Sequence, residues 1–199
     1  MKYSDIYRLY STSQPKDAIH QALREVPVDD SDEQYEDRSP LHLACQYGDT
    51  EGVKILLERD AEPNTKDANG STPIHILGRT SAGCADEDKL KEIAVMLIEQ
   101  GANIPRSAKN TTALIECIRN RHFKMAEAII DSGARVNSTD LNGENVLFGF
   151  CAASGDIRRD IRFAKKELDE SVQYRYPENK IEEIRSRIAR LEDDGETAY

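Results

Sequence analysis

The 199-residue chain has 38% hydrophobic and 32% charged residues, which is polar for a compact globule but ordinary for an elongated array that exposes more surface per residue. It carries 37 acidic against 27 basic side chains, so its long-range field repels phosphate backbones and anionic lipid surfaces. The first ten residues contain no apolar run of the kind found in secretion signals, and no segment is apolar enough to predict a membrane span. We therefore expect one soluble domain that binds neither nucleic acid nor membranes.

The beginning of the chain predicts a pair of helices. Over residues 15–26, Ile19, Ala22, Leu23 and Val26 form one apolar stripe of a helix, and residues 4–10 precede it as a shorter helix. This pair lacks the motif that begins the later helix pairs. We therefore expect it to cap the array, since the end of a solenoid needs a polar outer face.

A short motif recurs after this pair. Ser-Pro-Leu-His-Leu-Ala at residues 39–44 returns as Thr-Pro-Ile-His-Ile-Leu at 72–77, and weaker copies lie at 112–115 and 145–148. Each copy begins with a residue that can cap a helix, followed in two copies by Pro at the first helical position and then by apolar residues. Each copy therefore predicts the start of a helix.

A second apolar helix is predicted after each of the first three copies, at residues 53–57, 93–98 and 125–130. Turns rich in Asn, Asp and Gly follow two of these helices, at 64–70 and 137–143. The repeating unit is thus a helix pair joined to the next pair by a turn.

These motifs resemble the ankyrin repeat, in which a turn, a Thr-Pro-Leu-His-x-Ala helix, a second helix and a Gly-Ala ending follow in the same order. The resemblance implies an all-α solenoid of stacked helix-turn-helix units with hairpin-like fingers, flanked by capping helices. It divides a single domain over residues 1–199 into an N-terminal capping pair (1–33), repeat 1 (34–66), repeat 2 (67–107, with an insertion near 80–88), repeat 3 (108–139), a degenerate repeat 4 (140–172) and a C-terminal capping helix and tail (173–199).

The last predicted helix carries one apolar stripe, formed by Ile181, Ile184, Ile188 and Leu191, while its other faces are charged. We interpret it as a capping helix that folds back on repeat 4. The alternative is a docking or short coiled-coil segment, for which two heptads are few.

The histidines and cysteines do not predict a catalytic or metal site. The resemblance implies that His42 and His75 are structural hydrogen-bonding groups, while His20 and His122 stay unassigned. The four cysteines form no Cys-x-x-Cys pair and have no His at ligand spacing, so we expect no metal and no other cofactor. Free thiols in apolar helices favour a reducing compartment, the cytoplasm or the nucleus.

Catalysis has one candidate position. Cys84 lies in the polar insertion, where we expect it to be an exposed residue of no special role, because no general base is placed beside it. No phosphate-binding loop, nucleophile elbow or metal-binding helix motif occurs. We therefore expect no enzyme, with activity in the insertion or the C-terminal region as the alternative.

The resemblance implies that a partner lies across the finger tips and the concave face of the first helices. Aligned with the family, the positions expected to be exposed there are Tyr35, Arg38, Gln46, Tyr47, Lys66, Asn69, Ser71, Arg79, Thr80, Lys109, Arg119, Asn120, Leu141 and Glu144. Five of these are basic and one is acidic, which predicts a locally positive groove and an acidic partner. The acidic run at residues 29–37 is expected to be a solvated loop, or to cover that groove or orient the partner.

Together these features predict a monomeric protein-protein interaction module or adaptor. The alternatives are a host-directed effector, which would act in the host cytosol, an inhibitor of a signalling protein, an enzyme or enzyme-regulating subunit, and a self-assembling protein that uses the 181–191 stripe.

Overall fold

The computed structural model describes residues 1–80, 86–103, 112–134, 157–173 and 177–197. The chain divides into two compact units, Met1–Ser132 and Gly133–Tyr199, and each is described by itself. Regular secondary structure in the described ranges is helical, as expected for the all-α solenoid. The division of one domain into numbered repeats stays a prediction.

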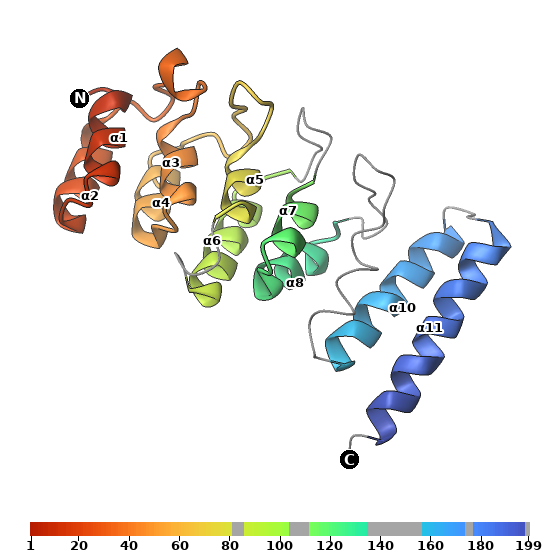
Figure 1. The fold of residues 1–199 in the computed structure, drawn as a ribbon. Helices are drawn as coiled ribbons and strands as arrows, with labels where there is room; N and C mark the ends of the chain where they lie inside the picture. The colour runs from red at the N-terminus through yellow and green to blue at the C-terminus, as the bar shows by residue number, and fades with distance from the viewer. Residues whose placement is uncertain (81–85, 104–111, 135–156, 174–176, 198–199) are drawn as a thin grey trace. The chain divides into compact units, whose positions relative to one another are not determined.

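The first unit is built from four helix pairs. They are α1 (Tyr3–Ser11) with α2 (Lys16–Glu25), α3 (Pro40–Gln46) with α4 (Thr50–Leu57), α5 (Pro73–Gly78) with α6 (Glu87–Glu99), and α7 (Ala113–Arg119) with α8 (Phe123–Asp131). The first helix of each pair contacts the first helix of the next, and the second helices contact one another in the same way (Figure 1). The pairs therefore stack in chain order.

The helix starts form where the repeated motif predicts them. The Nδ1 atom of His42 accepts hydrogen bonds from the backbone N–H of Ser39 at 3.1 Å and from its hydroxyl at 2.9 Å, and His75 does the same for Thr72. Pro40 and Pro73 stand at the first helical position, where a missing N–H costs nothing. In α7 the hydroxyl of Thr112 instead accepts from the N–H of Ile115.

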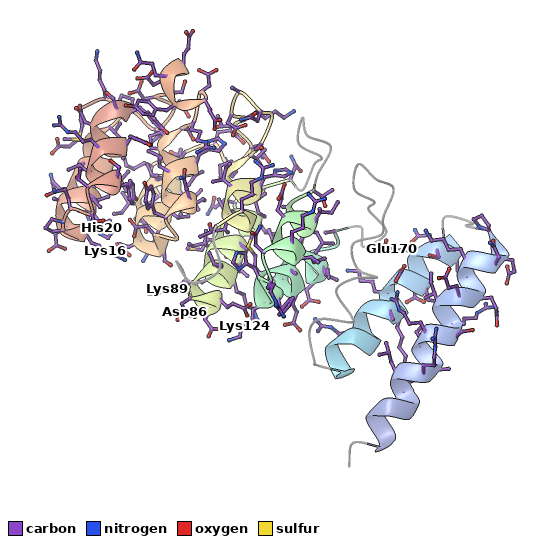
Figure 2. All side chains as sticks on the ribbon, viewed as in Figure 1. Lys16, His20, Asp86, Lys89, Lys124 and Glu170 are labelled. Carbon is purple, nitrogen blue, oxygen red and sulfur yellow. The ribbon has the colours of Figure 1, made fainter. Side chains whose placement is uncertain are left out.

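The apolar sides of the helix pairs form the core between neighbouring repeats. Leu23, Leu41, Leu56, Leu77 and Leu97 are each completely buried. Full burial of a side chain of this size contributes roughly 1.5–3 kcal/mol. The second helices are also joined through polar contacts: Figure 2 shows Lys124 of α8 near the start of α6, where its Nζ lies 2.6 Å from Asp88.

The turns between pairs project as fingers. The first finger contains a short 3₁₀ helix, η1 (Glu33–Tyr35), and the second is closed by a hydrogen bond of 2.9 Å from the N–H of Asp67 to the carbonyl of Ser71. The two fingers are linked because the N–H of Ala68 donates to the carbonyl of Glu36 at 2.8 Å. The order of the fingers thus follows that of the helix pairs.

Several predicted segments fall outside the described residues, namely the start of repeat 3 over 108–111, the turn at 137–143 and the motif copy at 145–148. The insertion predicted near 80–88 is described only at its edges, where α6 already begins at Glu87 with Asp86 as its cap. The side chain of Asp86 accepts from the N–H of Asp88, which satisfies a donor of the first turn.

The second unit contains an antiparallel pair of helices, α10 (Ile157–Gln173) and α11 (Glu178–Thr197), with Ala164, Ile184 and Ile188 buried between them. The predicted stripe of α11 therefore faces a helix. Glu167 and Arg187 form an ion pair of 2.6 Å within this contact. Whether this helix pair caps the array or docks to a partner stays a prediction. Among the described helices, none combines the length and the apolar character needed to cross a membrane.

Candidate partner-binding face

The candidate site is the surface formed by α1, α3, α5, α7 and the fingers, which we call the first-helix face. Its predicted residues differ in exposure. Tyr47, Lys66 and Arg119 are exposed, whereas Tyr35, Arg38, Gln46, Asn69, Arg79 and Asn120 are half-buried. Lys109, Leu141 and Glu144 lie outside the described residues.

Two of the predicted positions are buried, so the expectation that they are exposed is wrong. Ser71 is completely buried because its N–H donates to the carboxylate of Asp67 and its carbonyl accepts from Nε2 of His42 at 3.1 Å. Thr80 is 5% exposed, and its carbonyl accepts from Nε2 of His122 at 2.6 Å. Both residues hold neighbouring repeats together and offer no surface to a partner.

Two arginines of the predicted basic strip are already paired within the protein. Arg38 donates to Gln46 at 2.9 Å and lies against Glu36 at 2.5 Å and, more loosely, against Asp67 at 3.7 Å. These contacts tie the first finger to the end of α3 and to the second finger. The positive charge of Arg38 is thereby balanced.

Arg79 is balanced in the same way. Its guanidinium donates to the hydroxyl of Ser71 and lies 3.0 Å from the carboxylate of Glu116, which is 8% exposed. Asn120 adds a bond of 3.0 Å to the carbonyl of Gly78. Among the described residues of the predicted basic set, Lys66 and Arg119 are the exposed ones.

An aromatic strip runs along the N-terminal end of the first-helix face. It consists of Tyr3, Tyr7 and Tyr10 of α1, Tyr35 of η1 and Tyr47 at the end of α3. The ring of Tyr35 lies 5.6 Å from Tyr3 and 4.3 Å from Tyr7, and Tyr47 stacks on Tyr10 at 4.8 Å with an interplanar angle of 11°. Tyr35 and Tyr47 were predicted from the sequence, whereas the three tyrosines of α1 were missed. Their spacing on one side of a helix was the available signal.

The remaining histidines have structural partners. His42 is buried, which lowers its pKa from 6.5 to about 4, so it is a neutral hydrogen-bonding group as the family resemblance implies. His20 donates to Asp49 at 3.0 Å, and the same carboxylate accepts from the hydroxyl of Tyr10 at 2.8 Å. This cluster joins both helices of the capping pair to the start of α4. It was missed because the three residues are far apart in sequence.

The described thiols are Cys45 and Cys117, and both are completely buried. Burial raises the pKa of each thiol well above its usual range, so these groups are unreactive at neutral pH. Cys84 lies outside the described residues, and its predicted exposure stays untested. Within the ranges that the structure describes, no three or more His, Cys, Asp and Glu side chains come together as metal ligands.

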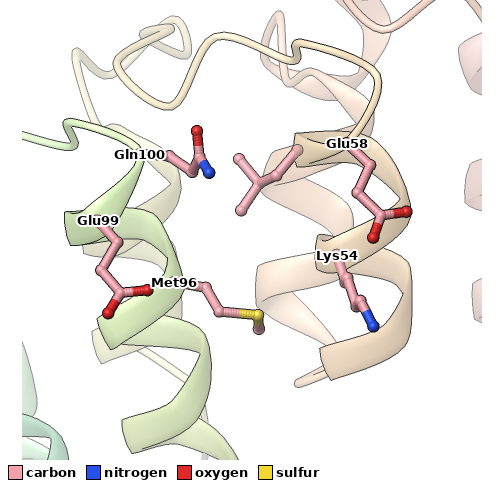
Figure 3. A pocket seen from close by; sticks show the side chains of 6 residues that line it. Lys54, Glu58, Met96, Glu99 and Gln100 are labelled. Carbon is pink, nitrogen blue, oxygen red and sulfur yellow. The ribbon is translucent and has the colours of Figure 1, made fainter.

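The opposite face, formed by the second helices, has a small depression between α4 and α6 (Figure 3). Its volume is about 200 Å³, and Lys54, Leu57, Glu58, Met96, Glu99 and Gln100 line it. Two apolar side chains and a mixture of opposite charges define no ligand chemistry. The first-helix face therefore remains the candidate site.

Comparison with known proteins supports this architecture. The family model described as "Ankyrin repeats (many copies)" matches residues 22–77. The chain is 38% identical over 69 residues to the transient receptor potential cation channel subfamily A member 1 homolog of Caenorhabditis elegans, a match that covers 35% of this chain and 6% of that protein.

Two further relatives match a longer part of the chain. Neurogenic locus notch homolog protein 1 of Mus musculus is 31% identical over 134 residues, which is 67% of this chain and 5% of that protein. Ankyrin repeat protein nuc-2 of Neurospora crassa is 29% identical over 124 residues, 61% of this chain and 10% of that protein. The chain thus spans about a tenth or less of the length of these relatives.

The stacked helix pairs define a helical repeat solenoid. With the matching family model and the repeat-containing relatives, they show that the chain is an ankyrin-repeat protein. Ankyrin repeats are generally protein-protein interaction modules.

Proposed function

We propose that this protein works by binding a partner protein across the first-helix face rather than by catalysing a reaction. The observation that supports this most directly is Tyr47, a large aromatic residue that is 39% exposed yet fixed by stacking on Tyr10. A rigid, partly exposed tyrosine is typical of the residues that dominate interface energies, because little side-chain entropy is lost on binding.

The charge of the partner is a finer part of the proposal. Lys66 on the second finger and Arg119 at the end of α7 are exposed and favour an acidic segment opposite repeats 2 and 3. Arg38 and Arg79, which the sequence predicts in the same positive region, form ion pairs with Glu36 and Glu116 within the protein. We therefore propose that acidic side chains of the partner contact repeats 2 and 3 alone.

Partner retention by matched variants tests this function. The partner is isolated from the native source on the immobilised protein, and the retained amount is compared between Tyr47→Ala, Arg119→Glu and the control Lys91→Glu. Lys91 is exposed on α6, away from the first helices. We expect both face variants to lose most of the retained partner and the control to keep it.

Equal retention by all three variants would contradict the proposal. Circular dichroism and thermal melting serve as the check on folding. Arg119→Glu and Lys91→Glu should change stability by less than about 0.5 kcal/mol, whereas Tyr47→Ala also removes the stacking on Tyr10 and should cost about 1 kcal/mol.

The roles of adaptor, host-directed effector and inhibitor concern the identity of the partner and remain predictions, as does the monomeric state. A reducing compartment is supported by the buried free thiols of Cys45 and Cys117.

A further inference from the structure

We propose that the aromatic strip and the acidic first finger together form a docking site for a cationic segment, one rich in Lys or Arg, of the partner protein. This inference rests on the proposed function and deepens it, because it assigns the N-terminal end of the first-helix face to a partner chemistry opposite to that expected at repeats 2 and 3. A bound segment would therefore have a fixed direction along the face.

The first support is the arrangement of the rings. Tyr35 bridges Tyr3 and Tyr7, with ring centroids 5.6 and 4.3 Å away, and Tyr47 lies on Tyr10. Tyr7 and Tyr35 are half-buried and Tyr47 is exposed, so part of the strip is open to solvent. Tyrosine ring faces attract ammonium and guanidinium groups through their quadrupole.

The second support is the charge beside the rings. Six of the nine residues at 29–37 are acidic, and Tyr35 lies within this run. Glu33 and Glu36 are exposed, and Asp32 caps η1. Carboxylates next to aromatic faces complement a cation and exclude an acidic or nucleic-acid ligand.

Arg38, which influences Tyr3 of the strip, does not cancel this field. Arg38 is held by Glu36 and by the buried Asp67, and it donates to Gln46. Its contacts therefore direct it along the face toward the second finger, and two carboxylates balance its single charge. The run at 29–37 keeps an excess of negative charge after this pairing.

The third support is a buried hydroxyl inside the strip. Tyr3 is 1% exposed, and its hydroxyl has no hydrogen-bond partner among the described residues. Its charged and aromatic neighbours are Arg38, Asp32, Tyr7 and Tyr35. The hydroxyl leaves one acceptor of the strip unsatisfied, but it is shielded from solvent, so a Lys or Arg of a bound segment reaches it only where the covering side chains move aside.

Nuclear magnetic resonance of ring-labelled tyrosine tests the proposal on the full chain. The chain has eight tyrosines, five of which form the strip. The probes are a peptide of alternating lysine and glycine and a matched peptide of alternating glutamate and glycine. We expect the lysine peptide to shift the strip signals and the glutamate peptide to leave them in place.

Matched variants separate the site from general attraction to an acidic protein. Tyr35→Leu removes a ring and Glu33→Gln removes a carboxylate at the site, while Glu92→Gln removes one from the exposed side of α6. We expect Tyr35→Leu and Glu33→Gln each to weaken binding of the lysine peptide, by about fivefold or less. Glu92→Gln should leave the affinity unchanged. Tyr35→Phe should bind the peptide as the unmodified protein does, because the ring face is retained.

Equal shifts with both peptides, unchanged affinity in Tyr35→Leu and Glu33→Gln, or the same loss in Glu92→Gln as in Glu33→Gln would each overturn the inference. The proposed partner-binding function is tested separately from this docking site. If Arg119→Glu loses the native partner while the lysine peptide does not bind the strip, the partner-binding function stands and only this docking site is ruled out.

Discussion

The contact between α3 and α5 and the contact between α5 and α7 are made with different chemistry. In the first, His42 is neutral and donates to the carbonyl of Ser71. In the second, Glu116 of α7 stands at a position that is apolar in the earlier repeats and pairs with Arg79 of α5, and α7 itself carries Ile115 where α3 and α5 carry a histidine.

The difference shows how a degenerate repeat keeps its place in the stack. The hydrogen bond of Asn120 to the carbonyl of Gly78 and the bond of His122 to the carbonyl of Thr80 hold α7 and α8 against repeat 2 where the Thr-Pro-Leu-His motif is lost. We expect the ion pair to contribute little net stability compared with an apolar contact, because desolvation offsets much of its attraction.

The largest expected effect is the acid sensitivity of the first contact. The pKa of His42 is 6.5 when unfolded and about 4 when folded, so the unfolded chain binds more protons between these values. The contribution of neutral His42 to the free energy of unfolding is fully present above about pH 6.5. It falls by roughly 3 kcal/mol as the pH drops toward 4. Urea unfolding measures the free energy of unfolding at pH 7.5 and at pH 4.5, near those limits. The loss of free energy between these two pH values should be smaller for His42→Gln than for the unmodified protein. The same difference in both proteins would contradict this assignment.

The contact between α5 and α7 should lose stability when one partner of the Arg79–Glu116 ion pair is removed. Glu116→Ala leaves Arg79 partly buried without that carboxylate, and we expect a loss of about 2 kcal/mol in the free energy of unfolding, less than for a fully buried pair because Arg79 is 25% exposed. The double variant Arg79→Met with Glu116→Leu should recover most of this loss, since Leu43 and Ile76 occupy the aligned position in the earlier repeats.

A control is available in the second unit. Arg185→Ala removes exposed pairs with Glu178 and Glu182, for which we expect a loss of less than about 0.5 kcal/mol. If the double variant is as unstable as Glu116→Ala, the ion pair contributes in a way that an apolar contact cannot replace.

The close approach of α5 and α7 gives a smaller effect. A Cβ atom on Gly78 would lie 3.1 Å from Cβ of Glu116 and 3.2 Å from the carbonyl oxygen of Ala113. Because the backbone of α7 cannot move away freely, we expect Gly78→Ala to cost about 1 kcal/mol despite the better helix propensity of Ala. Thermal unfolding measures this, and a rise in Tm would show that the helices separate easily.

The smallest effect compares the two fingers. Asp37 has a left-handed backbone with φ of 52°, and Gly70 holds the aligned position of the second finger with φ of 67°. Glycine adopts this conformation without steric cost, so Asp37→Gly should raise the free energy of unfolding by about 0.5 kcal/mol. Urea unfolding should detect the gain, and a loss would mean that the Asp37 side chain makes a stabilising contact.

The sequence predicted what depends on local pattern. The starts of α3, α5 and α7 follow from a capping residue before an apolar run, and the structural role of His42 follows from its place in the motif. Burial of Ser71 and Thr80 was not predicted, because alignment with a family gives a position and not the contacts made across neighbouring repeats.

The missed contacts join residues far apart in the chain. The His20–Asp49 cluster and the Arg79–Glu116 pair form only when helix pairs stack, so no spacing in the sequence reveals them. One signal was present for the second, because a charged residue at the aligned position of Leu43 and Ile76 requires a partner when it is buried.

Site-specific photo-crosslinking tests the central claim most directly, since it asks which face the partner contacts. A photoreactive phenylalanine analogue replaces Tyr47 on the first-helix face in one protein and Glu92 on the second-helix face in another, both at exposed positions. We expect the native partner to be captured from position 47 and not from position 92. Capture from position 92 alone, or equally from both, would contradict the account.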